Sequence, residues 1–445
     1  MKEILIIGAG RSATALINYV LNQAKKYGWN VTIADNNLEL AQKKLNAHPS
    51  GKAVKLDVLE EEVRRSLIKN SDIVVSLLPA FLHIEVAHDC IEFNKHLITA
   101  SYVSKEMYDL GDEALKRNLI FMGEMGLDPG IDHMSAMEKI DQIKEQGGVI
   151  KAFRSYTGGL ISPEDDNNPW RYKFTWNPRN VILAGQGTAQ YLENDVYKYT
   201  PYSRLFKEHT VVDVKGMGDF EMYANRDSLL YRDIYGLENI PNILRGTLRN
   251  VGYCDAWNAL IQIGLTDGSH PILNCHTLSY SEWLDGYTNI SDGGTTRERI
   301  AKLIGLKPDS EVLDKLEWLG LFSDQKITIR DANPAMILEN LLLRKWKLEE
   351  DDKDMIVMQH EFEYSLDGED RILYSTLVMK GNDSEDTAMA RLVGLPLGIF
   401  VKLVMLGKIT AKGVNIPVMK DVYAPVLEEL KEFDVVFKET EMVLA

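Results

Sequence analysis

The sequence predicts an α/β fold, in which a doubly wound parallel sheet precedes a second, α+β domain. Apolar runs alternate strictly with helical segments over roughly the first quarter of the chain, as in a parallel sheet with helices on both faces. A glycine-rich turn directly follows the first apolar run. After residue 128 the pattern changes to longer strands, which predicts the second domain.

The first domain is expected to be built from strand and helix pairs. "EILIIGAG" is an apolar strand that ends in glycines, and "RSATALINYVLNQAKKYG" is a helix that Gly28 ends. Further strands are predicted at "NVTIADNN", "AVKLDV", "DIVVSLLP", "HLITASY" and "LIFMGEM". Helices are predicted at "LELAQKKLNA", "EEEVRRSLIKN" and "HIEVAHDCIEFN".

The second domain begins with a helix over "IDHMSAMEKIDQIKEQGG" and a strand over "KAFRSYTGG". "DMIVMQHEFEYS" and "RILYSTLVMK" flank "LDGED" and predict a hairpin. Period 2 places Met358 and His360 on its buried face and Gln359 and Glu361 on its exposed face. His360 is expected to be structural, because the strand lacks the second histidine of a zinc motif. Residues of about 280–350 and the C-terminal tail have helical patterns.

Composition and charge restrict the function. The 445 residues include 50 Lys and Arg against 66 Asp and Glu, a net charge of −16, which argues against nucleic-acid and membrane partners. Cys90, Cys254 and Cys275 are too scattered for a disulfide framework or a zinc site, so we expect no metal and a cytoplasmic location. No apolar run approaches the roughly 20 residues of a membrane helix, and "MKEILIIGAG" is too short for a signal peptide.

The turn after the first strand is a dinucleotide-binding motif. Gly8, Gly10, Arg11, Ser12 and Ala13 match G-x-G-x-x-G/A between a strand and a helix, the arrangement of a Rossmann fold. Gly8 allows the tight turn, Gly10 lets the backbone approach a pyrophosphate, and Ala13 allows close packing. The helix N-terminus then faces the phosphates.

Asp35 ends the second strand at about the ~20-residue distance expected of the acid that binds the adenosine ribose. A carboxylate there repels the 2′-phosphate of NADP, and no Arg follows, so the sequence favours NAD over NADP. Asp57 is expected either near the adenine or as a helix N-cap. Leu78 and Pro79, in "SLLP", end the fourth strand, where the carboxyl ends of strands border the cofactor.

The chain resembles saccharopine dehydrogenase of the glutamate-forming type, also called saccharopine reductase. The segments that carry the resemblance are "SLLPAFLH", "TASYVS", "GEMGLDPGIDHM", "SYTGGLISPEDDNNPWRYKFTWNPRNVI", "RGTLRNVGY" and "LPLGIFVKLVMLGKI". The resemblance implies a Rossmann domain over residues 1–127 and 396–445. It also implies a mixed-sheet substrate and dimerisation domain over 128–395 with a helical insertion, and a homodimer.

The family oxidises the secondary amine of saccharopine with NAD(P) to an imine, whose hydrolysis gives glutamate and α-aminoadipate semialdehyde. For proton transfer, the resemblance implies Asp128 in "LDPG" and Tyr102 in "ASYVS". A turn residue and a core tyrosine are the alternatives. The residues expected to contact the substrate are Ser101, Thr157, Gly158, Gly159, Phe174 and Thr175. Of these, Thr157, Gly158 and Gly159 are expected to lie in a loop. Relatives often have Cys where this chain has Thr157.

Saccharopine has three carboxylates, which call for cations. Arg226 in "ANRDS" and Arg245 in "LRGTLR" are the candidates, since arginine binds carboxylates through two parallel N–H groups. Arg249 and Arg171 are expected to be surface residues paired with acids. A related reductase such as carboxynorspermidine dehydrogenase, or a non-catalytic NAD-binding protein on the same fold, remains an alternative.

Overall fold

In the computed structural model the chain forms two units, each built on its own sheet. The structure describes residues 2–289, 291 and 293–444. Unit 1 comprises Met1–Ile150, Ser365–Gly368 and Gly381–Lys438, and unit 2 comprises Lys151–Tyr364, Glu369–Lys380 and Glu439–Ala445. The segment 381–438 therefore belongs to the same unit as the first 150 residues.

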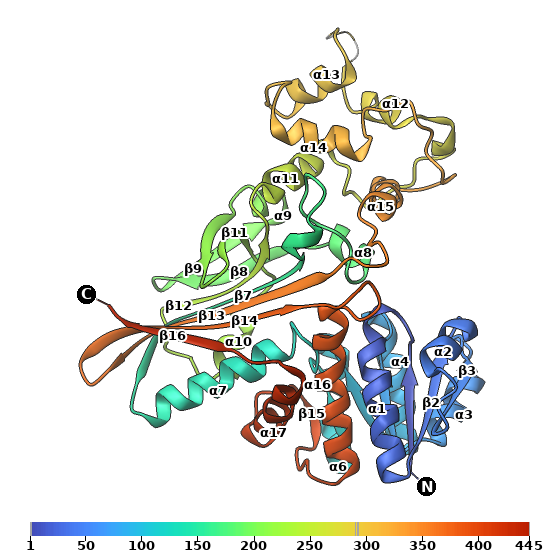
Figure 1. The fold of residues 1–445 in the computed structure, drawn as a ribbon, viewed down its shortest axis with the longest axis vertical. Helices are drawn as coiled ribbons and strands as arrows, with labels where there is room; N and C mark the ends of the chain where they lie inside the picture. The colour runs from blue at the N-terminus through green and yellow to red at the C-terminus, as the bar shows by residue number, and fades with distance from the viewer. Residues whose placement is uncertain (1, 290, 292, 445) are drawn as a thin grey trace. The chain divides into compact units, whose positions relative to one another are not determined.

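Unit 1 has a seven-stranded sheet in the order β3-β2-β1-β4-β5-β6-β15 (Figure 1). Its strands are β1 (Glu3–Ile7), β2 (Asn30–Asp35), β3 (Gly51–Lys55), β4 (Ile73–Ser76), β5 (His96–Thr99), β6 (Ile120–Met122) and β15 (Gly413–Asn415). All the pairs are parallel, which confirms the predicted doubly wound sheet. β15 was not predicted, because its sequence, Gly-Val-Asn, is not an apolar run like that of β6.

The helices of unit 1 flank this sheet. They are α1 (Thr14–Tyr27), α2 (Leu38–Leu45), α3 (Glu61–Lys69), α4 (His83–Phe93), α5 (Lys105–Asp109), α6 (Gly111–Lys116), α7 (Ile131–Glu145), α16 (Ala388–Met405) and α17 (Lys420–Leu430). As predicted, α1 ends at Gly28, which has the left-handed φ of 70°.

Helix α16 lies side by side with α1 (Figure 1). A Cβ on Gly394 would lie 2.6 Å from the backbone N of Leu16, and one on Gly398 would lie 2.6 Å from the ring of Tyr19. These two glycines therefore permit the close approach of the helices. The helix is 18 residues long with a mean hydropathy of 1.8, and 83% of it is buried. The sequence analysis found no apolar run near the length of a membrane helix and so missed this segment, which is mostly apolar because it belongs to the core of unit 1.

Unit 2 has a nine-stranded mixed sheet with the path β10-β11-β12-β7-β13-β14-β16, and β8 pairs with β12 and β9. Its strands are β7 (Val149–Ile161), β8 (Thr188–Glu193), β9 (Val196–Pro201), β10 (Thr210–Val214), β11 (Gly218–Ala224), β12 (Asn242–Arg249), β13 (Asp354–Leu366), β14 (Glu369–Lys380) and β16 (Lys438–Val443). β12 pairs in parallel with β7 and antiparallel with β11.

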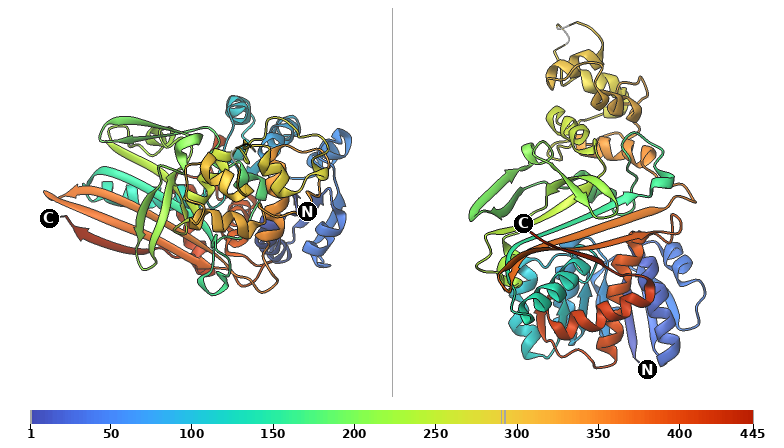
Figure 2. Two further views of the ribbon diagram at one scale, coloured as in Figure 1. Left: turned by 90° about the horizontal axis from the view of Figure 1, so that it is seen from above. Right: turned by 60° about the vertical axis from the view of Figure 1, so that its left-hand side comes forward.

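The predicted hairpin is β13–β14, whose long, twisted strands are orange in Figure 2. His360 is fully buried beside the rings of Phe153 and Phe362, which agrees with a structural role. The prediction that Gln359 is exposed was wrong. Its side chain is buried, donates to Asp213 O at 3.2 Å and accepts from Lys215 N at 2.9 Å, because β13 is an interior strand.

The helices of unit 2 include a group at residues 275–350. The helices are α8 (Pro178–Ile182), α9 (Tyr202–Leu205), α10 (Leu230–Ile234), α11 (Tyr253–Ile263), α12 (Tyr280–Asp285), α13 (Thr296–Leu303), α14 (Glu311–Leu319) and α15 (Pro334–Lys345). Aromatic side chains, among them Trp170, Trp257 and Trp346, form the core under these helices.

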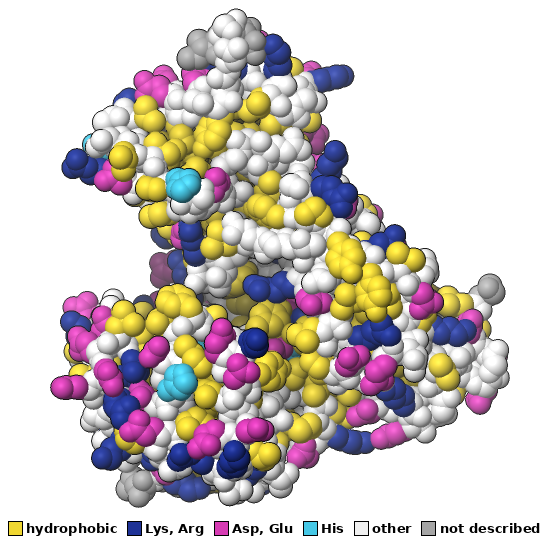
Figure 3. Space-filling model, turned by 180° about the vertical axis from the view of Figure 1, so that it is seen from behind, with side chains coloured by type: hydrophobic (Ala, Val, Ile, Leu, Met, Phe, Trp, Pro, Cys, Tyr) yellow, Lys and Arg dark blue, Asp and Glu magenta, His cyan; other side chains and the backbone are white. Residues whose placement is uncertain are grey.

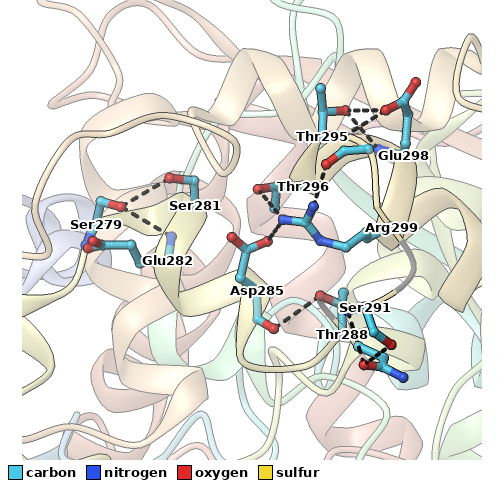
Figure 4. A network of polar contacts seen from close by, with 12 residues as sticks. Ser279, Ser281, Glu282, Asp285, Thr288, Ser291, Thr295, Thr296, Glu298 and Arg299 are labelled. Carbon is cyan, nitrogen blue, oxygen red and sulfur yellow. Dashed lines mark hydrogen bonds and ion pairs between the residues drawn. The ribbon is translucent and has the colours of Figure 1, made fainter.

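Two of these helices begin with capping boxes, drawn in Figure 4. Ser279 and Glu282 satisfy the first N–H groups of α12, and Thr295 and Glu298 do the same for α13. The Arg299 guanidinium donates to Asp285, which ties α13 to the end of α12. This polar network is therefore explained by helix capping and helix pairing.

Candidate active site

The glycine-rich loop follows β1 in unit 1. Gly8 has φ 106°, and its N donates to Ala34 O at 2.8 Å. A Cβ on Gly10 would meet no atom within 4 Å, so open space lies beside its backbone. This cradle fits a pyrophosphate. The helix starts later than predicted, because Arg11, Ser12 and buried Ala13 form a 3₁₀ turn ahead of α1.

Asp35 lies at the end of β2, as predicted, and its carboxylate is braced against the glycine-rich loop. Oδ2 accepts from Ala9 N at 2.7 Å, and Oδ1 accepts from Asn37 N at 2.8 Å. The carboxylate therefore has a fixed direction at the position that faces an adenosine ribose in this fold.

Three further predicted cofactor residues lie just past the strand ends. Asp57 follows β3 by two residues and accepts from Leu59 N at 3.0 Å. Glu60 is the N-cap of α3, so the alternative of an Asp57 N-cap was wrong. Leu78 and Pro79 follow β4 and precede a 3₁₀ turn at Ala80–Leu82.

Buried His83, which the sequence reasoning missed, joins the ends of β4 and β5 through its two ring nitrogens. Its Nδ1 lies 2.8 Å from Ser76 Oγ, and its Nε2 lies 2.8 Å from Ser101 Oγ and 3.2 Å from Thr99 Oγ1. Burial lowers the pKa of His83 to about 4, so the ring is neutral at pH 7. His83 thereby fixes the hydroxyl of Ser101, next to Tyr102.

Tyr102 and Asp128, predicted as a pair, come together in unit 1. The Tyr102 hydroxyl donates to Asp128 Oδ1 at 3.4 Å, and both side chains are half-buried. Tyr102 also lines a cavity of about 360 Å³ beside β5 and β6, together with His83, Thr99 and Gly123. The Asp128–Pro129 peptide bond is cis. A carboxylate beside a phenol at such an edge can accept and return a proton.

The loop around Asp128 and the first turn of α7 contain three further functional candidates that the sequence reasoning missed. Glu124, Asp132 and His133 are all buried, and His133 Nε2 lies 2.9 Å from Glu124 Oε2. All three belong to the segment "GEMGLDPGIDHM". The two acids and the histidine around Asp128 could therefore have been predicted from the sequence as functional candidates.

In unit 2 the two predicted arginines lie in different settings. Arg245 is buried in β12, and its guanidinium lies 4.5 Å from the centre of the Tyr231 ring. Arg226 is exposed, has φ 51°, and its carbonyl accepts from Gln190 N at 2.8 Å.

Thr157, Gly158 and Gly159 lie inside β7, so the predicted substrate loop was wrong at these positions. β7 is an interior strand between β12 and β13, where backbone N–H groups serve the sheet ladder. A Cβ on Gly158 would lie 2.9 Å from the Leu248 side chain, so that glycine permits packing. Thr157 is paired with Thr247 in register and shares a face with Arg245.

Several buried polar atoms in this unit have no partner within the described chain. The hydroxyls of Thr157 and Thr175 are two of them. Buried hydroxyls are normally hydrogen-bonded, so these two fit a site that a polar ligand or water completes. Phe174, by contrast, stands edge-on to Trp346 with ring centres 5.3 Å apart, as a core residue.

Arg249 is not a surface residue, so that prediction was wrong. It is 4% exposed and lies 5.2–5.7 Å from the ring centres of Tyr172, Tyr223 and Tyr253. It donates to Leu248 O at 3.0 Å and to the Tyr223 hydroxyl at 3.3 Å. The guanidinium of Arg249 is thus surrounded by aromatic rings instead of the acidic partner that was expected. Arg171 is paired at the surface with Asp166, as expected.

The acidic side chains do not form a single patch on the face drawn in Figure 3. Acidic and basic side chains are interspersed there.

Two family models match the chain. The saccharopine dehydrogenase NADP binding domain matches residues 4–122, and the saccharopine dehydrogenase C-terminal domain matches residues 126–435. The glutamate-forming, NADP(+) saccharopine dehydrogenase of Saccharomyces cerevisiae is 34% identical over 441 residues, which is 97% of both chains. Its counterpart in Schizosaccharomyces pombe is 32% identical over 439 residues. These names specify NADP and give no support to the expected preference for NAD.

The mitochondrial α-aminoadipic semialdehyde synthase of Mus musculus is 34% identical over 449 residues. The chain spans 47% of that protein, about half its length. Among solved structures, the apo glutamate-forming saccharopine dehydrogenase of Saccharomyces cerevisiae has a TM-score of 0.89 at 32% identity and covers 99% of this chain. That likeness confirms the predicted fold class.

Proposed function

Because the chain belongs to the saccharopine dehydrogenase family, we propose that it oxidises saccharopine to glutamate and α-aminoadipate semialdehyde, or catalyses the reverse reaction. The observation that carries this proposal is the Tyr102–Asp128 pair at the carboxyl edge of the parallel sheet. In folds of this type the reactive end of the cofactor and the substrate meet at that edge.

The proposed reaction needs a proton acceptor twice. A nicotinamide cofactor held at Gly8, Gly10 and Asp35 would supply a hydride acceptor for the carbon that becomes the aldehyde. Asp128 takes the proton of the secondary amine as the C=N bond forms and returns it to that nitrogen as water adds to the carbon. It takes a proton from this water in the same step. Asp128 gives that proton to the glutamate nitrogen as the C–N bond breaks, and it accepts the hydroxyl proton of the carbon that becomes the aldehyde. Tyr102 orients the Asp128 carboxylate through its hydroxyl.

The proposed substrate-binding groups come from unit 2. Arg226 and Arg245 bind the substrate carboxylates, and the hydroxyls of Thr157 and Thr175 donate to them. Arg245 supports this role, because its guanidinium lies against an aromatic ring inside the unit. Ser101 of unit 1, held by His83, is proposed as a further hydrogen-bond donor.

The test is to mix the purified chain with saccharopine and NAD or NADP and to follow the absorbance of the reduced cofactor. We expect absorbance to rise with one of the two cofactors. A chain that binds cofactor but gives no rise with either would contradict the proposed function.

We also propose that Asp35 sets the cofactor preference toward NAD, although the relatives are named for NADP. The support is the Asp35 carboxylate, held by Ala9 N and Asn37 N where it would repel a 2′-phosphate. Asp35→Ala combined with Asn36→Arg should shift the ratio of kcat/KM toward NADP by about 10-fold or more. An unchanged ratio would place the discrimination elsewhere.

We propose, finally, a cytoplasmic homodimer. Three free, buried cysteines support a reducing compartment. Light scattering on the purified chain tests the dimer, and a monomeric mass at micromolar concentration would contradict it.

A further inference from the structure

A network of three buried ionisable side chains adjoins the loop that carries Asp128. His133, in the first turn of α7, is 0% exposed, and Glu124 and Asp132 are 3% and 2% exposed. His133 Nε2 lies 2.9 Å from Glu124 Oε2, and its Nδ1 lies 3.6 Å from Asp132 Oδ2. Burying such groups costs free energy, so their contacts have to be considered one by one.

Glu124 holds the segment that contains Tyr102. Its Oε1 accepts from Val103 N at 3.1 Å, and its backbone N donates to Ser101 O at 3.0 Å. Tyr102 stands between these two tethered residues. Glu124 also has φ 55°, a left-handed conformation that is unfavourable for a residue with a side chain. The contacts with Val103 and His133 hold it in that conformation.

Asp132 holds the loop that contains Asp128. Its Oδ1 accepts from Gly130 N at 2.6 Å, and its backbone N donates to Leu127 O at 3.0 Å. A Cβ on Gly130 would lie 2.1 Å from Gly126 O, so the turn has room only for glycine. Asp128 therefore lies in a turn whose two ends both bond to the start of α7.

We propose that the Glu124–His133–Asp132 network is a positioning device for the Tyr102–Asp128 pair. His133 links the acid that tethers the tyrosine segment to the acid that tethers the aspartate loop, so the two segments keep one spacing. The spacing matters because the Tyr102–Asp128 contact, at 3.4 Å, is near the limit of a hydrogen bond and a small displacement removes it. The three residues act through the backbone, and their kinetic effect rests on the proposed function.

The decisive variants are His133→Leu, which removes the imidazole contacts with Glu124 and Asp132, and His133→Gln, which keeps a donor for Glu124. Glu145→Gln, at the exposed C-terminal end of α7, is the matched control, because the Glu145 carboxylate pairs with Lys420. We expect His133→Leu to lower kcat by about 100-fold with little change in either KM, since a small misplacement of reacting groups costs that much. His133→Gln should recover most of the loss, and the control should behave as the wild type.

Hydrogen–deuterium exchange, read by mass spectrometry on peptides covering residues 100–104 and 126–131, tests the device without turnover. Glu124→Gln and Asp132→Asn keep the side-chain shape and serve if His133→Leu does not fold. We expect Glu124→Gln to speed exchange in the first peptide and Asp132→Asn to speed it in the second. If the wild type does not oxidise saccharopine, the proposed function fails, while this measurement still decides the positioning proposal.

Three outcomes overturn the proposal. One is a folded His133→Leu protein with wild-type kcat. Another is a fall in kcat that His133→Gln does not recover. The last is exchange in the two peptides that is unchanged in the isosteric variants, or that rises equally over all of α7.

Discussion

The two units hold their charged candidate residues in opposite ways. In unit 1 the acids accept from backbone N–H groups: Asp35 from Ala9, Glu124 from Val103, and Asp132 from Gly130. In unit 2 the cations lie against rings, Arg245 on Tyr231 and Arg249 among three tyrosines. An N–H donor fixes the direction of a carboxylate, whereas an aromatic ring holds a guanidinium through its face. Unit 1 therefore fixes its acids through the backbone, and unit 2 holds its arginines through aromatic side chains.

This comparison predicts that substitutions in unit 1 change kcat and substitutions in unit 2 change KM. The largest expected effect is that of Asp128→Asn. Loss of a positioned base should lower kcat by roughly 10²–10⁴-fold, while cofactor affinity is retained. Steady-state kinetics and a cofactor fluorescence titration measure the two quantities.

The matched control for Asp128→Asn is Asp112→Asn, an exposed aspartate of α6 in the same unit. It should leave kcat unchanged. If Asp128→Asn also leaves kcat unchanged, Asp128 is only a turn residue, and the assignment of chemistry to unit 1 fails.

Arg245→Met should raise KM for saccharopine by roughly 10–100-fold with little change in kcat, because a hydrogen bond to a charged group contributes about 1.5–3 kcal/mol. Arg171→Met is the control, since Arg171 is paired with Asp166 at the surface. Initial rates over a range of saccharopine concentrations give both constants. An unchanged KM together with a lower melting temperature would make Arg245 a structural residue and remove the contrast between the units.

Local patterns in the sequence predicted the parts of the fold and site that depend on neighbours along the chain. The parallel sheet, the glycine-rich loop and the β13–β14 hairpin each follow from a period or a turn signal. Tyr102 and Asp128 meet because both follow strands of the same parallel sheet, whose carboxyl ends share one edge.

The parts that failed depend on contacts between distant segments. Arg249 is buried because Tyr172, Tyr223 and Tyr253, from three separate segments, surround it, and no local pattern shows that. The tether between Glu124 and Val103 likewise exists only once β5 and β6 lie side by side. The sequence shows Glu124 and Asp128 in one motif, but it does not show which residues they contact.

The third prediction concerns acid stability in unit 1. Burial lowers the pKa of His83 from 6.5 to about 4, so between these values the unfolded chain binds a proton that the folded chain does not. The free energy of unfolding should therefore fall by about 3 kcal/mol from pH 7 to pH 4 through this residue. Denaturant unfolding at several pH values measures the slope.

His83→Gln should flatten that slope, because glutamine does not titrate. His88→Gln is the control, since His88 is exposed on the same helix, and it should keep the wild-type slope. A His83→Gln protein that loses stability with acid as steeply as the wild type would show that other groups control the acid response of unit 1.

The smallest expected effect is that of Thr157→Val, and it has opposite signs in stability and binding. The buried Thr157 hydroxyl has no partner within the described residues, so its removal should raise the free energy of unfolding by about 1 kcal/mol. If the hydroxyl donates to a substrate carboxylate, KM should rise by roughly 5–10-fold, the value of one net hydrogen bond. Thr157→Ser, which keeps the hydroxyl, should leave KM unchanged. Lower stability in Thr157→Val would mean that the hydroxyl is bonded in the free protein, and Thr157 would then be a structural residue of unit 2.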